Sequence, residues 1–444
     1  MIRLCDLDDC FEGVIPSIIA TTAADGTPNI SYLSHVVMVD DSHIAISNQF
    51  FAKTAANIRA NPRVTLQLVS GRTSAQYQLV AIWVGSEDHG PFFTRVEGQL
   101  NASSAQVGMA GIMRLRAIDI FRIEKIMAVP SPFTQENTPG DALAPDLQAV
   151  GRAARAIASE GDTESVIGAL LSGCRALGFN HAILLLADPA RGQLATVASN
   201  GYDRSGVGSE VAFGEGLIGT AAVSGLSVKV SDMSRVRRLG AAIGAGAPAD
   251  ENRTRTIALP SLPDPMSQIA VPLLAHGSLQ GVLFVESRSR LAFGRNHDQA
   301  LEILASAAAL ALALSENLAS QARPAVSLPV SSPIEGRAIR ILHHPFDDSV
   351  FIDNIYVIKG VAGRLLAHML EIYVREGRCE FTNREIRATE SLRLPEFKDN
   401  LETRLLLLRR RMEERNLPIR LLHTGRGQIK LAVDGIPEIN RKGE

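Results

Sequence analysis

Two proline-rich stretches constrain the fold of this 444-residue chain more than any other feature. VPSPFTQENTPGDALAPD (129–146) holds four prolines, and SQARPAVSLPVSSPIEG (320–336) is rich in Pro and Ser. Such composition favours extended, solvated chain over packed structure. The chain is therefore predicted to form three domains, at 1–130, 145–320 and 335–444, within the two to four that this length allows.

Charge is distributed unevenly over these three blocks. The whole chain has a formal net charge of −2, which argues against a generic polyanion binder. Residues 334–444, however, hold 20 Lys+Arg against 17 Asp+Glu, so the rest of the chain carries a net charge of −5. This division predicts a sensing or catalytic body joined to a mildly basic module.

The cysteines and the apolar runs predict a cytoplasmic protein that does not cross a membrane. Cys5, Cys10, Cys174 and Cys379 form no C-x-x-C pair and no zinc set with His, so reduced thiols and no metal are expected. A redox pair of Cys5 and Cys10 is the alternative. The start of the chain lacks the apolar core of a signal peptide. The longest apolar run (303–315) is too short and too rich in Ala to span a bilayer.

The first block reads as β-rich. Many short strands with few helices are typical of a barrel. Asp25-Gly26 is a hairpin signal between two apolar runs. Strands are predicted on both sides of this turn and in HIAIS, RVTLQLV, YQLVAIWVG, TRVEGQL and DIFRIEKI.

A candidate anion site lies in SNQFFAKTAANIRANPRV (47–64). Ser47 and Asn48 end a strand, and Lys53 and Thr54 open a short helix. Free backbone N–H groups and the helix dipole attract an anion at such a helix start. A lysine ammonium and a hydroxyl would complete a phosphate site. The alternative is an exposed lysine on a short helix.

The stretch 18–69 resembles the pyridoxamine 5′-phosphate oxidase-like, FMN-binding split-barrel family. The resemblance rests on the hairpin with its Asp/Gly turn, the Ser-Asn pair, the Lys-containing turn and Asn-Pro-x-Val, while TRVEGQL and DIFRIEKI resemble the closing strands. It implies a homodimer that binds FMN across its two-fold interface. The implied cofactor-binding residues are Lys53, Thr54 and Ser47 at the phosphate, with Asn48, Ser34 and Gln67 near the phosphate, ribityl chain or ring.

Oxidation of pyridoxamine phosphate is not expected from this block. Family members with that activity carry several arginines for the substrate phosphate and an Arg-rich C-terminal segment. Only scattered arginines, such as Arg95 and Arg122, occur here, and LSHVVMV replaces the basic strand. No catalytic residue is therefore assigned.

The middle block alternates helices and strands. Helices are predicted at 146–159, 163–177 and 296–319, and strands in HAILLLAD, QLATVASNG, SQIAVPLLAHG and LQGVLFVES. VAFGEGLIGTAAVSGLSVKVSDMS and the last two strands resemble the GAF family of small-molecule sensor domains. Gly214, Gly216 and Gly219 are then a turn before a helix that closes over a ligand cavity, not a dinucleotide fingerprint. The alternative is a domain that binds no ligand and only dimerises.

The third block predicts three short strands, helices at 362–376, 382–388 and 397–415, and a hairpin around Gly425-Arg426-Gly427. Leu401, Leu405, Leu408 and Met412 fall on one stripe of the last helix, which predicts a face toward a core. Cations on a neighbouring stripe are placed to reach phosphates and base edges from the major groove. A solvated basic face is the alternative. The predicted DNA-binding residues are Asn400, Arg404, Arg411 and Arg415 on the helix, with Arg426 and Lys430 on the hairpin.

This third block resembles the OmpR/PhoB-type winged helix, with LETRLLLLRRRMEE as the recognition helix and IRLLHTGRGQIKL as the wing. The receiver domain that normally precedes such a module is not found in the sequence. Leu406 and Leu407 point away from the core stripe, which suggests contact with a partner or with a second winged helix.

The sequence as a whole predicts a multidomain α+β protein: a split β-barrel, a GAF α/β sensor domain and a C-terminal winged helix. The expected function is cytoplasmic transcription regulation by a homodimer that senses a flavin or a small-molecule ligand and binds DNA. The first alternative is an FMN-dependent oxidoreductase that the other two domains regulate. An interaction scaffold with empty pockets is the second.

Overall fold

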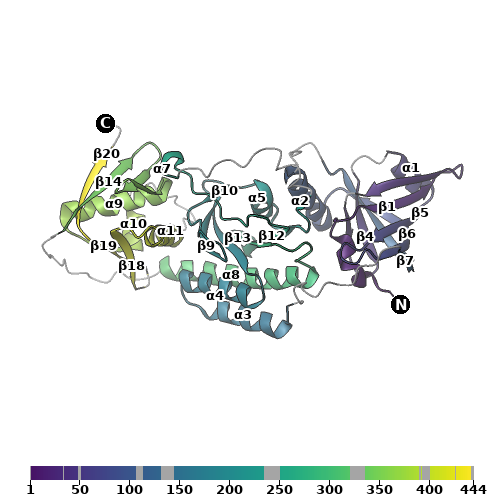
Figure 1. Cartoon of the computed structure of the whole chain (residues 1–444), viewed down its shortest axis with the longest axis horizontal. Helices are drawn as coiled ribbons and strands as arrows, with labels where there is room; N and C mark the ends of the chain where they lie inside the picture. The colour runs from purple at the N-terminus through teal and green to yellow at the C-terminus, as the bar shows by residue number, and fades with distance from the viewer. Residues whose placement is uncertain are drawn as a thin grey trace.

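The computed structural model describes residues 2–33, 35–48, 52–106, 114–131, 145–234, 251–320, 336–389, 392, 401–425 and 427–441. They form an N-terminal unit (2–131), a middle unit (145–320) and a C-terminal unit (336–441), which follow one another along the long axis of the molecule (Figure 1). The centres of both proline-rich stretches, 132–144 and 321–335, lie outside the described residues.

The N-terminal unit is built on a curled, antiparallel seven-stranded sheet of order β2-β1-β5-β6-β7-β4-β3. The predicted hairpin is present, because Thr22 pairs with Pro28 on the two sides of Asp25-Gly26. Buried side chains alternate along β1 and β5, as expected for strands with one face toward a core. The strands are β1 (Ser17–Thr22), β2 (Pro28–Leu33), β3 (Val36–Met38), β4 (His43–Asn48), β5 (Arg63–Val69), β6 (Gln76–Glu87) and β7 (Ala117–Val129).

One predicted strand of this unit is wrong. TRVEGQL belongs to helix α2 (Pro91–Gln106). Val96 and Leu100 are both buried, packing with Val37 and Ile118. A separation of four residues places two side chains on one side of a strand and also on one face of a helix, so the apolar pattern could not distinguish the two. The other helices are the 3₁₀ helix η1 (Leu4–Phe11) and α1 (Ala52–Ala60).

The middle unit is a six-stranded antiparallel sheet of order β10-β9-β8-β13-β12-β11. Helices α3 (Leu147–Ser159), α4 (Thr163–Ala176) and α8 (Arg295–Ser320) cover one face (Figure 1). Helix α5 (Gly216–Ser224) packs on β12 and β13. The central strand β8 is apolar along most of its length because both of its faces are covered. The strands are β8 (His181–Asp188), β9 (Gln193–Asn200), β10 (Glu210–Ala212), β11 (Val228–Val230), β12 (Ser267–Ala275) and β13 (Ser278–Ser287).

The glycines ahead of α5 form the predicted turn. Gly214 and Gly216 have positive φ values of +84° and +59°, which favour glycine. Gly219 lies on the first turn of the helix, where an added Cβ would come within 2.3 Å of the carbonyl oxygen of Ala212. The motif therefore serves a tight turn and close packing.

Helix α8 is the one helix among the described residues that is long and apolar enough to cross a membrane, over Arg295–Ser315 with a mean hydropathy of 1.3. Half of that window is buried, and the helix packs along α3, α4 and β12. Its apolar side chains therefore contribute to the core of the middle unit. The cytoplasmic location stays a prediction.

The C-terminal unit combines two small sheets with three helices. The four-stranded sheet has the order β16-β15-β14-β20, and the three-stranded sheet has the order β17-β19-β18. β20 (Ile436–Arg441) pairs in parallel with β14 and was not predicted from the sequence. The other elements are β14 (Ala338–His344), β15 (Ser349–Ile352), β16 (Ile355–Ile358), α9 (Gly360–Glu376), β17 (Glu380–Thr382), α10 (Asn383–Ala388), α11 (Leu401–Glu414), β18 (Ile419–Gly425) and β19 (Gln428–Val433), followed by β20 at the C-terminal end.

The middle and C-terminal units share one continuous cluster of buried apolar side chains. Helix α11 lies between them and contacts β9 and α4 of the middle unit as well as α9, β16 and β18 of its own unit (Figure 1). The N-terminal unit meets the middle unit through α2, which packs on α5 and β11.

Candidate functional site

The residues predicted to bind FMN lie on three elements of the N-terminal unit. Ser47 and Asn48 are at the end of β4, Lys53 and Thr54 begin α1, and Gln67 is on β5. Ser34 lies outside the described residues, as do residues 49–51 between β4 and α1. Lys53 is exposed, whereas Ser47 and Thr54 are buried.

Three of these side chains already have protein partners. The Thr54 hydroxyl accepts from Asn29 Nδ2 at 3.0 Å and shares a hydrogen bond with Ser31 Oγ at 2.8 Å. Asn48 Nδ2 donates to the buried carboxylate of Asp119 at 3.0 Å. The Gln67 amide donates to Gln76. The structure therefore gives these residues internal roles, because their bonds join α1 to β2, β4 to β7 and β5 to β6.

Two buried polar atoms beside these residues lack a hydrogen-bond partner within the structure. They are Ser47 Oγ, on a residue 1% exposed, and His35 Nδ1. His35 adjoins Ser47, because its carbonyl oxygen accepts the Ser47 N–H at 3.1 Å. Burial lowers the pKa of His35 to about 4, so the ring is neutral at pH 7. Buried polar groups normally have partners, so these two unpaired atoms fit hydrogen bonding to a polar group of a bound ligand.

The arginines predicted to contact DNA are turned toward carboxylates in this structure. Arg411 is 1% exposed and Arg404 is 7% exposed. Arg411 donates to Val357 O at 3.1 Å and pairs with Glu251 at 2.7 Å. Arg404 pairs with Asp188 at 3.2 Å, and Arg415 pairs with Glu251. In this arrangement none of these three side chains is placed to meet a phosphate or a base edge.

Of the remaining predicted DNA-binding residues, the structure describes Lys430. Lys430 is half-buried on β19, with Glu380 opposite it on β17. Arg426 and Asn400 lie outside the described residues. The Gly-flanked hairpin predicted around position 426 is present, with Gly425 paired to Gln428.

Two further arginines of α11 make contacts that the sequence reasoning missed. Arg410 donates to Val197 O of β9 at 2.7 Å, and burial lowers its pKa. Arg409 pairs with Glu164 on α4. The run Arg409-Arg410-Arg411 marks this part of the helix as basic in the sequence. The predicted DNA-binding face included only Arg411 from this run.

The outward leucines of α11 have an intramolecular partner. Leu406 and Leu407 are each 6% exposed. Leu407 lies with Leu186 and Leu194 of the middle unit, and Leu406 lies beside Glu164 in a second groove. The expected partner of these leucines is therefore the middle unit of the same chain.

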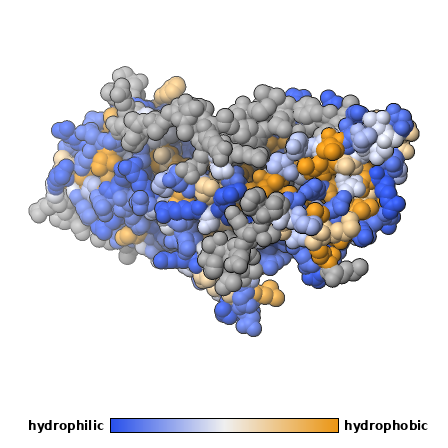
Figure 2. All heavy atoms as spheres, turned by 45° about the vertical axis from the view of Figure 1, so that its right-hand side comes forward, coloured by the Kyte–Doolittle hydropathy of each residue, from blue (hydrophilic) through white to orange (hydrophobic). Residues whose placement is uncertain are grey.

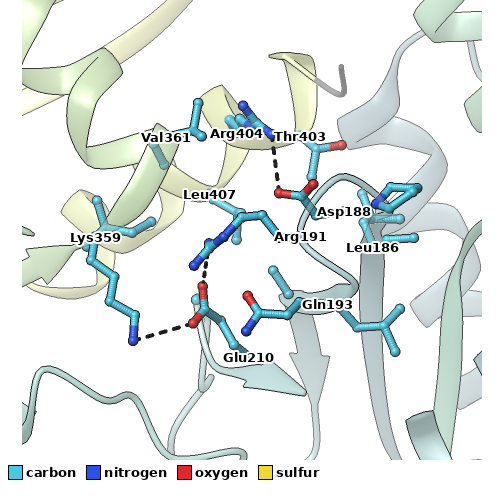
Figure 3. A pocket seen from close by; sticks show the side chains of 17 residues that line it. Leu186, Asp188, Arg191, Gln193, Glu210, Lys359, Val361, Thr403, Arg404 and Leu407 are labelled. Atoms are coloured by element: carbon cyan, nitrogen blue, oxygen red, sulfur yellow. Dashed lines mark hydrogen bonds and ion pairs between the residues drawn. The ribbon is translucent and has the colours of Figure 1, made fainter. Parts of the chain in front are cut away.

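The groove around Leu407 lies between the middle and C-terminal units and is bordered by charged side chains (Figure 3). Glu210 bridges Arg191 of its own unit, at 2.9 Å, and Lys359 of the C-terminal unit, at 3.5 Å. The Arg404–Asp188 pair lies on the other side (Figure 3). Opposite charges thus meet across this interface at two separate places.

A second charged cluster joins the N-terminal and middle units. Lys229 on β11 contacts Glu12 at 2.8 Å and Asp298 on α8 at 2.7 Å. Burial acts to lower the pKa of Lys229, but the two carboxylates outweigh it and raise the pKa. Burial raises the pKa of Asp298 to about 7, against the lowering effect of Lys229. Arg95 and Arg295 border the adjoining cavity of about 140 Å³.

Comparisons with known families agree with this arrangement of the first two units. Residues 7–115 match the family model of pyridoxamine 5′-phosphate oxidase, and residues 160–313 match that of the GAF domain. The chain therefore contains a pyridoxamine 5′-phosphate oxidase-like domain followed by a GAF domain. The winged helix stays a prediction. No curated protein matches the chain in sequence.

Solved structures resemble separate parts of the chain. An FMN-binding protein from Syntrophomonas wolfei is 17% identical, covers 28% of this chain and 86% of its own, and has a TM-score of 0.25. The GAF domain of an Acinetobacter phosphoenolpyruvate-protein phosphotransferase is 18% identical, with coverage of 39% and 95% and a TM-score of 0.32. Free methionine-R-sulfoxide reductase from Neisseria meningitidis is 20% identical, with coverage of 38% and 89% and a TM-score of 0.30.

Proposed function

We propose that this chain is a transcriptional regulator whose C-terminal unit is a winged helix that binds DNA. The observation that supports this best is the order of elements after α9: β17, α10, α11 and then the β18–β19 hairpin, which forms one sheet with β17. In a winged helix, the second helix of such a pair is the recognition helix and the hairpin that follows it is the wing. Here these roles would fall to α11 and to the β18–β19 hairpin. The pyridoxamine 5′-phosphate oxidase-like and GAF domains would then supply the sensing part.

DNA binding by the full chain is the test of this proposal. A winged helix that contacts phosphates should bind a duplex with an affinity that falls as salt rises. Replacing Arg426, which stands between Gly425 and Gly427 in the sequence, by alanine should weaken binding to all sequences and reduce the salt slope by about one unit. Fluorescence anisotropy against salt measures both quantities. An affinity and a salt slope that Arg426→Ala leaves unchanged would remove the hairpin from the proposed interface.

We further propose that the N-terminal unit binds FMN. Ser47, with its unpaired buried hydroxyl, and the exposed Lys53 would hold the phosphate, and the bound flavin would supply redox chemistry. Thr54, Asn48 and Gln67 would support the strands and α1 around the site through the bonds described above. Ser34 belongs to the same proposal on sequence grounds alone.

Lys53→Ala should weaken FMN binding by about 1.5 to 3 kcal/mol, because it removes a charge-assisted contact to phosphate. Titration followed by flavin fluorescence gives the dissociation constant. Arg59→Ala is the matched control, since Arg59 is an exposed cation near the other end of α1. Equal affinities for the two variants would exclude Lys53 from the site, and a wild type that binds no FMN would exclude the cofactor.

An FMN-dependent oxidoreductase is the competing function, favoured by the match to pyridoxamine 5′-phosphate oxidase. Turnover of NAD(P)H by the flavin-loaded protein, independent of DNA, would support the enzyme over the regulator. Loss of flavin binding in Lys53→Ala would not separate the two functions, whereas this turnover would.

A homodimer is part of the proposal. Figure 2 displays apolar side chains that gather toward the end of the molecule where the N-terminal unit lies. Ile30 and Tyr32 on the edge strand β2 are 70% and 72% exposed, and Val84 on β6 is 52% exposed. Large exposed apolar side chains in one region are typical of a protein interface. Sedimentation of the full chain as a monomer would contradict the dimer.

A further inference from the structure

Helix α11 contacts the middle unit on the side that faces away from its own core. Leu401, Leu405, Leu408 and Met412 form the stripe toward the C-terminal unit, and all four are buried. The opposite side of the helix carries Leu407, Arg410 and Glu414, because residues at these spacings lie about half a turn from that stripe. Leu407 packs beside Leu186, Arg410 donates to Val197 O, and Glu414 accepts from Ser205 at 2.6 Å.

Three arginines of α11 and Arg415, which follows the helix, flank this contact and end on carboxylates of the middle unit. Each of these carboxylates pairs with at least one guanidinium, so the contact is charge-complementary along the length of the helix. We call Glu164, Asp188 and Glu251 the acidic face. Its pairs are Asp188 with Arg404, Glu164 with Arg409, and Glu251 with both Arg411 and Arg415.

The acidic face offers α11 the same chemistry that a DNA backbone would. Carboxylate and phosphate oxygens both accept charge-assisted hydrogen bonds from guanidinium groups. A major groove admits a helix only if the outward side of that helix is clear. Here the outward side is covered by β9, and the flanking cations are paired. The middle unit and DNA would therefore compete for one helix.

We infer that the middle unit is an intramolecular partner of α11 that holds the C-terminal unit in a closed arrangement, from which α11 is released before it enters DNA. This inference rests on the proposed DNA-binding function. The acidic face occupies the helix in place of phosphates, and Leu406 and Leu407 add apolar contact on the same side. The apparent affinity for DNA is then the intrinsic affinity multiplied by the fraction of chains with α11 released.

Neutralising the acidic face tests this inference. Asp188→Asn combined with Glu251→Gln removes three of the four ion pairs and keeps the size of both side chains. The full-length double variant should bind a random-sequence duplex of about 30 bp at least about tenfold more tightly than wild type at low salt. Asp203→Asn combined with Glu160→Gln is the matched control, because it removes the same charge from two exposed residues of the middle unit. The control should bind like wild type.

A reversible cross-link gives a second test that does not depend on the folding of the neutral variant. Ser205 Oγ and Glu414 Oε1 are 2.6 Å apart across the contact, so cysteines at these two positions lie within the span of a short bis-methanethiosulfonate cross-linker, which attaches to each thiol through a disulfide. Cross-linked Ser205→Cys/Glu414→Cys should lose duplex binding about tenfold or more, and reduction should restore it. Amide hydrogen exchange of α11 should be slower in the cross-linked form and faster in the neutral double variant than in wild type.

The outcomes separate this inference from the function beneath it. Tighter binding by the neutral variant, with faster exchange in α11, supports both. Equal duplex affinities for wild type, the neutral variant and the cross-linked variant overturn the closed arrangement and leave DNA binding intact. If no form binds the duplex at low salt, including the neutral variant, the proposed function fails and the inference falls with it.

Discussion

Arg411→Ala is expected to lower the free energy of unfolding of the C-terminal unit by about 3 kcal/mol, because it breaks a buried ion pair and leaves its partner without that cation. Arg411 is 1% exposed and holds Val357 O, Glu414 and Glu251 at 3.1, 3.0 and 2.7 Å. The loss should appear in urea unfolding followed by circular dichroism. Faster amide exchange in α9 and β16 would place it in the C-terminal unit.

Arg420→Ala is the control for this result. Arg420 pairs with Asp434 at 3.0 Å, but both side chains are more than half exposed, so its loss should cost less than about 1 kcal/mol. A double-mutant cycle of Arg411→Met with Glu251→Gln should return a coupling energy, since the two residues are in contact. If Arg411→Ala unfolds at the same urea concentration as Arg420→Ala, the buried pairing described here is wrong.

Lys229→Met is expected to destabilise the junction of the N-terminal and middle units by about 3 kcal/mol at pH 8. The substitution removes the cation between Glu12 and Asp298, whose side chains are 13% and 18% exposed. Two facing carboxylates without a cation repel each other unless one is protonated. The loss should therefore be smaller at pH 5. Trp83, the one tryptophan of the chain, lies on β6 and reports unfolding of the N-terminal unit by fluorescence.

Asp298 gives the same junction a pH dependence in the wild type. Its pKa of about 7 in the folded protein exceeds the ordinary value of 3.8. The folded state therefore keeps a proton that the unfolded state has released between these values. The contribution of Asp298 to the free energy of unfolding is therefore fully present below the ordinary pKa. This contribution is lost as the pH rises toward 7, by at most about 1.4 kcal/mol per pH unit.

Comparison of wild type with Asp298→Asn measures this effect. The urea midpoint of each protein is measured at pH 5 and at pH 8. Between these pH values, the midpoint of the wild type should fall by more than that of Asp298→Asn. The charged groups around the position remain the same in both proteins: Asp8, Glu12, Arg95, Lys229 and Arg295. A difference that stays constant over this range would mean that Asp298 does not titrate there.

Local sequence signals predicted most of the secondary structure because each needed only neighbouring residues. Asp25-Gly26 is a turn whatever the rest of the chain does, and Gly214 and Gly216 adopt positive φ values that favour glycine. The leucine stripe of α11 likewise predicted which side meets its own core. The predicted strand at 94–100 is a helix in the structure. Its two buried apolar residues are four positions apart, and this spacing places side chains on one side of a strand as well as on one face of a helix.

The pairing of α11 was decided only by tertiary structure. Arg411 reaches Glu251 across 160 positions of sequence, and Arg404 reaches Asp188 across 216. Spacing along one helix identifies which cations share a face, but it carries no information about which distant carboxylates the fold brings to that face. The same holds for Lys229, whose partners Glu12 and Asp298 come from two different units.

The sequence by itself thus determined most of the strands and helices and the likeness of the first two parts to known domains, because these depend on local pattern. Only the tertiary structure decided that the basic helix is covered rather than open and that the predicted cofactor residues Thr54, Asn48 and Gln67 are bonded within the protein. Burial and ion pairing depend on packing between segments far apart in the chain, and packing is a property of the folded molecule.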